Sequence, residues 1–339
     1  MTVPVRSPEH EASVPDAVVA VSWSPDGTRA IVGGAAGGVW LVDAAGSVCG
    51  TLPGHRDGLF QAAWQPDGPL AATSGQDGHV RLWDPARGVE VAAIQAGASW
   101  VEQVAWSPSG EWLAIGAGRH LTLWHRERGV VHVLSSHRST ISALAWRPDS
   151  RVVGAASYGG VSLWEAASGQ AAGSLPWKTS MLSLAWSPDD RWVVAGTQDL
   201  AVQVWPQPFQ EGGELAMSGY AGKVRDLAWH RSGRYLATAG GDEIMVWDCG
   251  GTGPEGKTPR MLRGHEARVT ALAFQRRGHL LASGGQDGQV LFWNAGKMSD
   301  ALRQSRLGSP VTAMAVSPDD ATLLVGGHDG RLAWVRFPG

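Results

Sequence analysis

The feature that most constrains the fold is an internal repeat of 40 to 45 residues that runs through the chain eight times. Each copy has an apolar segment, a polar turn such as the SPDG at 24–27, a second segment of small residues, a glycine-rich turn and a third apolar segment. A period of this length indicates stacked supersecondary units rather than one ordinary core. The first segments end at Trp23, Trp64, Trp106, Trp146, Trp186, Trp229, Phe274 and Val316.

Each copy has the signature of β-strands joined by tight turns. Proline at the second turn position presets its φ, and Asp and Gly suit the positions that follow, so the turn joins antiparallel strands. A fourth, weaker strand follows most copies, for instance at 89–94. The sequence therefore predicts an all-β fold in which residues 1–339 form a single closed β-propeller with eight four-stranded antiparallel blades. A seven-bladed ring with one copy set aside is the alternative.

The ends of the chain raise the question of how the ring closes. Only seven fourth strands lie between the copies, and the sequence stops just after the eighth third strand. The segment TVPVR at 2–6 resembles a fourth strand without a copy of its own, so residues 1–12 are predicted to supply the outer strand of the last blade. Pro4 suits an outermost strand, which tolerates a missing backbone donor.

Short motifs inside the copies point to a known family. Gly54-His55 and Gly264-His265 precede first strands, while Trp83-Asp84 and Trp247-Asp248 end third strands. This pattern resembles the WD-repeat family across essentially the whole chain. In that family a His, a strand Ser or Thr, a turn Asp and a third-strand Trp form a hydrogen-bonded chain. The resemblance implies two complete sets here, His55, Thr73, Asp77 and Trp83, and His265, Ser283, Asp287 and Trp293.

These two sets could be mistaken for hydrolase triads, but we expect buried structural networks inside blades. The column before the first-strand aromatic is Ser22 followed by seven alanines, which supply no general acid or base. The segment 251–258 fits the phosphate-loop pattern, yet Pro259 and a strand-like segment follow it where that motif needs a helix. No metal-ligand spacing occurs, so no cofactor, metal or catalytic residue is predicted.

Composition narrows the class of partner. The 28 basic and 31 acidic side chains give a net charge of −3, which favours neither nucleic acid nor a membrane surface. The N-terminal residues carry no apolar run of the kind a signal peptide needs. Cys49 and Cys249 cannot form a disulfide framework, so we expect a reduced, cytoplasmic protein, and the Arg-rich and Ala/Gly-rich composition suggests a bacterial source. We expect a monomer.

The family resemblance implies a non-catalytic scaffold that binds a protein or peptide partner. The alternative is a propeller enzyme or metal-binding accessory protein with a polar central funnel. We expect the partner on the face that carries the turns before first strands and between second and third strands, because side chains from every blade converge there. The candidate residues are Trp100, Arg225, Phe60, Glu102, Gln76, Gln198, Gln286, His328, Lys178, Lys223, Tyr220 and Trp177. Trp177 and Tyr220 also occupy the His column, where they could instead fill a structural position.

Overall fold

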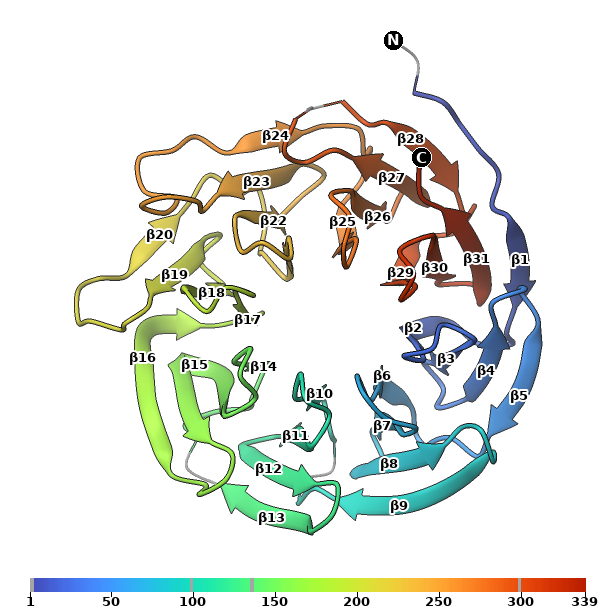
Figure 1. Ribbon diagram of the computed structural model, residues 1–339, viewed down its shortest axis with the longest axis horizontal. Helices are drawn as coiled ribbons and strands as arrows, with labels where there is room; N and C mark the ends of the chain where they lie inside the picture. Colours follow the sequence, from blue (N-terminus) through green and yellow to red (C-terminus); the bar gives the residue numbers. More distant parts are fainter. Residues whose placement is uncertain (1–2, 98–99, 135–136, 298–299) are drawn as a thin grey trace.

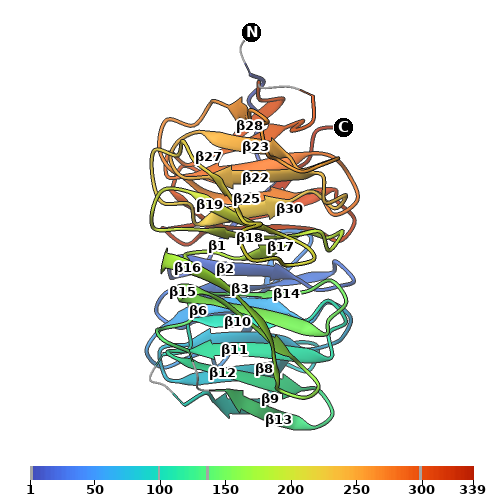
Figure 2. The ribbon, with the colours of Figure 1, turned by 90° about the vertical axis from the view of Figure 1, so that its left-hand side faces the viewer.

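In the computed structural model, which describes residues 3–97, 100–134, 137–297 and 300–339, the chain forms eight antiparallel sheets arranged as a ring (Figure 1). Seen from the edge, the ring is a flattened disc (Figure 2). The described residues contain strands and turns but no helix, and so no helix able to cross a membrane. The prediction of eight blades is confirmed, and the seven-bladed alternative is wrong.

Within each blade the strands are called a, b, c and d from the axis outward, and blade 1 begins at β2. The a strands are β2 (Val18–Trp23), β6 (Leu59–Trp64), β10 (Gln103–Trp106), β14 (Ala143–Trp146), β17 (Ala185–Trp186), β21 (Asp226–Trp229), β25 (Val269–Phe274) and β29 (Val311–Val316). The b strands are β3 (Arg29–Gly34), β7 (Ala71–Gly75), β11 (Trp112–Ala117), β18 (Trp192–Gly196), β22 (Tyr235–Ala239), β26 (Leu281–Gly285) and β30 (Thr322–Gly327).

The c strands are β4 (Val39–Asp43), β8 (His79–Asp84), β12 (His120–His125), β19 (Val202–Pro206), β23 (Ile244–Asp248), β27 (Gln289–Trp293) and β31 (Arg331–Arg336). The d strands are β5 (Val48–Leu52), β9 (Val89–Gln95), β13 (Gly129–Leu134), β16 (Ala171–Ser180), β20 (Leu215–Met217), β24 (Arg260–Leu262), β28 (Arg303–Arg306) and β1 (His10–Ser13). Because neighbouring strands are antiparallel, the a–b and c–d turns lie on one face of the ring, called the a–b face. The b–c turns and the d–a connections lie on the other, called the b–c face.

Blade 4 departs from the four-strand pattern. Its sheet has the order β14-β15-β16, and the long β15 (Val152–Glu165) takes the places of both the b and c strands. The first half of β15 pairs with β14 and the second half with β16. Gly159 and Gly160 lie between the two halves with φ of +92° and +125°, conformations that glycine adopts without steric cost.

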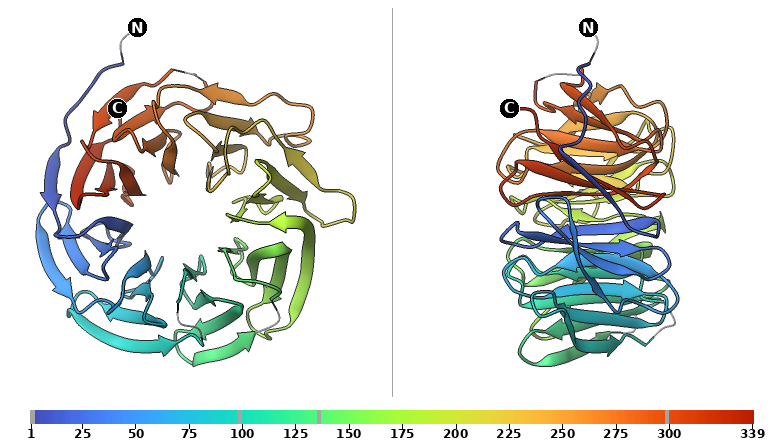
Figure 3. Two further views of the ribbon diagram at one scale, coloured as in Figure 1. Left: turned by 180° about the vertical axis from the view of Figure 1, so that it is seen from behind. Right: turned by 90° about the vertical axis from the view of Figure 1, so that its right-hand side faces the viewer.

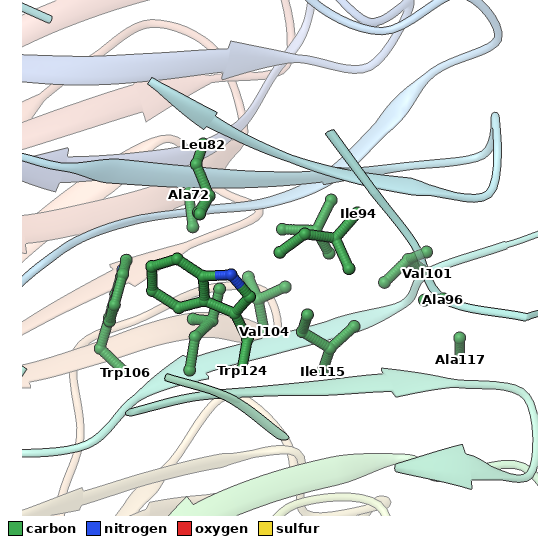
Figure 4. Packing of buried hydrophobic residues seen from close by; sticks show 12 residues of the cluster. Ala72, Leu82, Ile94, Ala96, Val101, Val104, Trp106, Ile115, Ala117 and Trp124 are labelled. Atoms are coloured by element: carbon green, nitrogen blue, oxygen red, sulfur yellow. The ribbon is translucent and has the colours of Figure 1, made fainter. Parts of the chain in front are cut away.

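The hydrophobic core lies between neighbouring blades. Figure 4 shows the cluster between blades 2 and 3, in which Leu82 and Ile94 of one blade face Trp106, Ile115 and Trp124 of the next. All five side chains are buried. A buried Trp removes roughly 150–250 Å² from water, so the two Trp columns supply much of the packing between blades.

Hydrogen bonds from the a-strand Trp column also join blades. The indole Nε1–H of Trp106 donates to the carbonyl of Ala63 at 3.2 Å, and that of Trp146 donates to the carbonyl of Ala105 at 2.9 Å. The acceptor is each time the small residue just before the aromatic of the preceding blade. The alanine column therefore permits the close approach of the next blade's indole ring.

The same interactions close the ring between blades 8 and 1. Trp23 Nε1–H donates to the carbonyl of Ala315 at 3.1 Å, and the hydroxyl of Thr312 donates to the carbonyl of Val18 at 2.6 Å. The N-terminal segment completes blade 8, as predicted, but the pairing residues lie at the end of the predicted range 1–12. The pairing strand is β1, with His10 opposite Trp334 of β31, rather than residues 2–6.

The segment before β1 runs along the rim, as the right-hand view of Figure 3 shows. Val5 forms an isolated parallel bridge with Gln304 of β28, the outer strand of blade 7. The N–H of Arg6 donates to the carbonyl of Gln304, and the N–H of Gln304 donates to the carbonyl of Pro4, both at 2.9 Å. The N-terminal segment therefore contacts two blades. Thr2 lies outside the described residues.

Candidate functional site: the b–c face of the ring

The first predicted network lies in blade 2, where the d–a connection brings His55 against the b strand. Trp83 Nε1–H donates to Thr73 Oγ1 at 2.8 Å, the same hydroxyl lies 2.8 Å from His55 Nε2, and His55 Nδ1 lies 2.9 Å from Asp77 Oδ1. Burial lowers the pKa of His55. The neutral ring therefore accepts from the Thr73 hydroxyl and donates its Nδ1–H to the carboxylate.

The second network repeats this geometry in blade 7. His265 Nε2 and Trp293 Nε1 both lie 2.8 Å from Ser283 Oγ, and His265 Nδ1 lies 3.1 Å from Asp287 Oδ2. Thr73 and Ser283 are fully buried, so neither hydroxyl can reach a substrate. Both sets have the buried structural arrangement that the sequence predicted, because each polar atom is satisfied inside its own blade.

Blade 6 contains a variant of this network in which tyrosine replaces histidine. The Tyr220 hydroxyl lies 2.7 Å from Thr238 Oγ1 and accepts a hydrogen bond from Trp247 Nε1 at 2.9 Å. Burial raises the pKa of Tyr220 to about 12. Tyr220 is 7% exposed, so its place among the partner-binding candidates was wrong, and the reading that it fills the histidine position is the correct one.

The strongest candidate on the b–c face is a pair of aromatic rings from blades 2 and 3. Trp100, in the d–a connection before β10, is 55% exposed. Its ring centroid lies 6.1 Å from that of Phe60 in β6, with the planes tilted by 54°. Glu102, half-buried, follows two residues later. The structure thus brings two of the predicted residues together as an aromatic pair in which Trp100 is exposed and Phe60 is half-buried.

Basic residues occupy the opposite side of the ring, because blade 6 lies across the axis from blade 2. Lys223 and Arg225 are exposed in the d–a connection that leads into β21. Burial raises the pKa of the neighbouring Asp226 to about 7, although the charges of Arg268 and Arg225 act in the other direction. The structure does not bring Arg225 near Trp100. A partner that contacts both must extend across the face.

Four candidates precede the turn Asp or its equivalent, and their backbones are fixed in the same way. The N–H groups of Gln76, Gln198, Gln286 and His328 donate to carbonyls of Gly58, Ser180, Arg268 and Pro310 at 2.8–3.0 Å. Gln198, Gln286 and His328 are exposed, whereas Gln76 is half-buried. These side chains are therefore held at the b–c face by backbone bonds that do not depend on the side chain.

The last two candidates lie on the outer strand of blade 4. Trp177 is half-buried in β16 and packs against the hydrophobic cluster between blades 4 and 5. The Lys178 ammonium lies 5.7 Å from the Trp177 ring centroid, a cation–π geometry. Trp177 thus supports the packing of blades, while exposed Lys178 remains accessible at the surface.

Two exposed apolar residues on this face escaped the sequence reasoning. Tyr158, 54% exposed, and Leu200, 40% exposed, lie at the b–c turns of blades 4 and 5. Leu200 adopts a φ of +59°, a backbone conformation that is uncommon for residues other than glycine and unfavourable for a bulky side chain. The sequence could have pointed to both residues, because each is an apolar residue in a turn that usually carries Gly or Asp.

The other motifs of the sequence show no catalytic arrangement. Lys257, in the phosphate-loop-like segment, donates from Nζ to the carbonyls of Asp248 and Gly250 at 2.9 and 2.7 Å. The loop leads into β24 rather than into a helix. In the described part of the chain, no group of three or more His, Cys, Asp or Glu residues could hold a metal ion.

The fold and the two networks define an eight-bladed repeat propeller. The family model "WD domain, G-beta repeat" matches residues 46–84, 89–125, 128–165, 173–206, 213–248, 256–294 and 302–333. The chain belongs to this family. The matched segments include a d strand and the a, b and c strands of the next blade, so each repeat links two blades.

Curated relatives match shorter stretches. U3 small nucleolar RNA-associated protein 15 of Schizosaccharomyces pombe is 33% identical over 103 residues, 30% of this chain and 20% of that protein. Anaphase-promoting complex subunit cdh1 of Dictyostelium discoideum is 29% identical over 144 residues, 41% of this chain and 18% of that protein. Probable cytosolic iron-sulfur protein assembly protein 1 of Malassezia globosa is 35% identical over 92 residues, 24% of this chain and 26% of that protein.

The matched stretches thus span about a quarter or less of these relatives' lengths. All three come from eukaryotes, so they give no support to the predicted bacterial source. A solved structure, that of the computationally designed Ika8 protein, has a TM-score of 0.80, 23% identity and 99% coverage of both chains. At this identity the likeness shows the fold alone. The relatives fit a role in protein interaction.

Proposed function

We propose that this chain is a non-catalytic scaffold that binds a protein or peptide partner across its b–c face, with the Phe60–Trp100 pair as the main anchor. The observation that carries the proposal is the 55% exposure of Trp100, a side chain that the repeat does not require to be aromatic. Trp is enriched among the interface residues that contribute most binding energy. Its contact with Phe60 holds the ring in place before binding, which lowers the entropy lost on association.

The charges around the face suggest the chemistry of the partner. Glu102 follows Trp100 by two residues in the same connection, while Lys223 and Arg225 lie on the far side of the axis. A segment with an apolar side chain for Trp100 and an acidic group toward blade 6 complements both sides. Complementary charges of this kind contribute more to orientation and association rate than to affinity.

The test begins with identification of the partner by a photo-crosslinking amino acid placed at position 76, on the same face, so that the Trp100 side chain is kept. The affinity of the purified partner is then measured for Trp100→Ala, Arg225→Ala and Arg234→Ala. Arg234 is a matched control, because it is an exposed arginine of the same blade on the a–b face. Trp100→Ala is expected to weaken binding about thirtyfold, the equivalent of about 2 kcal/mol. Unchanged affinity, or an equal loss for Arg234→Ala, would refute the proposed surface.

A further inference from the structure

A cavity on the a–b face, between blades 6 and 7, lies outside the surface proposed for the partner. Its volume is about 290 Å³. Binding sites for small molecules are typically about 300–1,000 Å³, so this cavity suits a ligand with one or two rings. Its lining comes from the a–b turns of both blades and the c–d turn of blade 7. The lining residues are His230, Tyr235, Phe274, His279, Asn294, Ala295, Gly296 and Lys297.

Aromatic rings form the inner part of this cavity. His230 is 5% exposed, and its ring meets those of Phe274 and Tyr235 in edge geometries at 5.5 and 6.1 Å. His279 stacks on His230 with centroids 5.3 Å apart and planes 21° apart. Such a set of ring faces and edges favours an aromatic ligand, because aromatic pairs gain energy beyond the area they bury.

Hydrogen bonds orient the two imidazoles. The Ser232 N–H donates to His230 Nδ1, so Nδ1 is the acceptor. Burial lowers the pKa of His230, which favours the neutral ring with its proton on Nε2. That Nε2 lies 3.2 Å from both the Gly278 carbonyl and His279 Nδ1. This contact and the stacking of the two rings hold the His279 imidazole against His230 at the wall of the cavity.

The charge of the lining selects for an anion. Among the described residues, the lining holds the ammonium of Lys297 but no carboxylate. The Arg260 guanidinium also lies close, since it donates to the carbonyl of Ala295 at 2.8 Å. The cavity between blades 1 and 2 differs, because Asp26 and Arg29 both line it.

We propose that this cavity binds a small aromatic carboxylate, with the ring against Phe274 and Tyr235 and the carboxylate near Lys297 and His279. This ligand chemistry has two sources: a free aromatic acid, or the C-terminal carboxylate of a peptide that ends in an aromatic residue. The site is independent of the proposed scaffold function, since it lies on the other face of the ring.

The experiment titrates the full chain with 3-phenylpropionate and with its neutral amide, followed by calorimetry. The acid is expected to bind at least about tenfold more tightly than the amide, and Lys297→Ala is expected to remove that preference. Lys257→Ala is the matched control, because Lys257 belongs to a c–d loop of the same face but does not line the cavity. It should bind the acid as the unaltered chain does, and both variants should keep the original melting temperature.

Equal binding of acid and amide, no saturation with the acid up to about 10 mM, or an equal effect of Lys257→Ala would overturn the proposal. A second titration with Gly-Gly-Phe distinguishes the two sources. Binding at least as tight as that of 3-phenylpropionate supports a peptide C-terminus, whereas binding about tenfold weaker supports a free acid.

Discussion

Replacing Thr73 by Val tests whether the buried network holds blade 2 together. The two side chains have nearly the same shape, so packing is kept while the hydroxyl is lost. Thr73 Oγ1 accepts from Trp83 Nε1–H and donates to His55 Nε2, both at 2.8 Å. Thr73 and Trp83 are fully buried, so water cannot replace the lost partner.

The expected cost follows from the two atoms left without a partner. A buried polar group left unsatisfied costs about 1–3 kcal/mol. The variant leaves the Trp83 indole donor and the His55 imidazole acceptor without a hydrogen-bond partner. We therefore expect a loss of about 3 kcal/mol in the free energy of unfolding. Typical domains have a total of about 5–15 kcal/mol, so this loss is readily measured.

Urea unfolding followed by Trp fluorescence measures the loss. Thr51→Val on the exposed outer strand β5 is the matched control and should change stability by less than about 0.5 kcal/mol. The double variant Thr73→Val, Trp83→Phe removes the stranded donor and should cost less than the sum of the two single changes. A loss below about 0.5 kcal/mol for Thr73→Val would refute the structural role of the network.

Three further changes have defined outcomes. Asp226→Asn should stabilise the chain at pH 8 and leave it unchanged near pH 3 in urea unfolding. The pKa of Asp226 is about 7 in the folded chain and has its ordinary value of 3.8 in the unfolded chain, so stability is lost as pH rises between these values; a pH-independent effect would contradict this. Deleting residues 1–13, which removes β1, should lower the melting temperature by several degrees, and deleting 1–9 should lower it less; equal melts would contradict the role of β1 in closure. Iodoacetamide should label exposed Cys49 in the folded chain but label Cys249 only after unfolding, since burial raises the Cys249 pKa to about 12; fast labelling of both would contradict the structure.

The architecture could be predicted because the same order of apolar segments and polar turns recurs eight times. A single Trp such as Trp106 is ambiguous, but Trp in the same phase of most copies indicates a face that every unit buries against the next. The polar turns marked where strands reverse, and the Gly-His and Trp-Asp pairs marked where copies begin and end. These features are local in sequence, so they can be read without knowing the three-dimensional arrangement.

Within the predicted range 1–12, the sequence pointed to residues 2–6 rather than to the residues that pair, because the pairing strand carries no apolar pattern. The residues 10–13 of β1 are HEAS, and all but one of them are exposed. An outermost strand has few apolar neighbours, so pairing depends on backbone groups rather than on side chains. The segment at 2–6 has the more strand-like composition, yet within its described part only an isolated bridge forms, at Val5.

The candidate site was predictable only in part, since it depends on contacts between blades. Trp100 could be singled out because the repeat gives no reason for an aromatic residue there. Its contact with Phe60 joins residues 40 positions apart in different blades and follows only from the ring. Tyr220 was ambiguous because an aromatic residue with a hydroxyl can either bind a partner or replace the structural histidine.

Hydrogen–deuterium exchange of the chain with and without its partner tests the central claim most directly. Slower exchange is expected in the d–a connections and b–c turns, in the peptides that contain Trp100, Tyr158 and Lys223. The a–b turns, including that around Arg234, should exchange at the same rate in both states. Protection of the a–b turns with no change around Trp100 would contradict the account and place the partner on the opposite face.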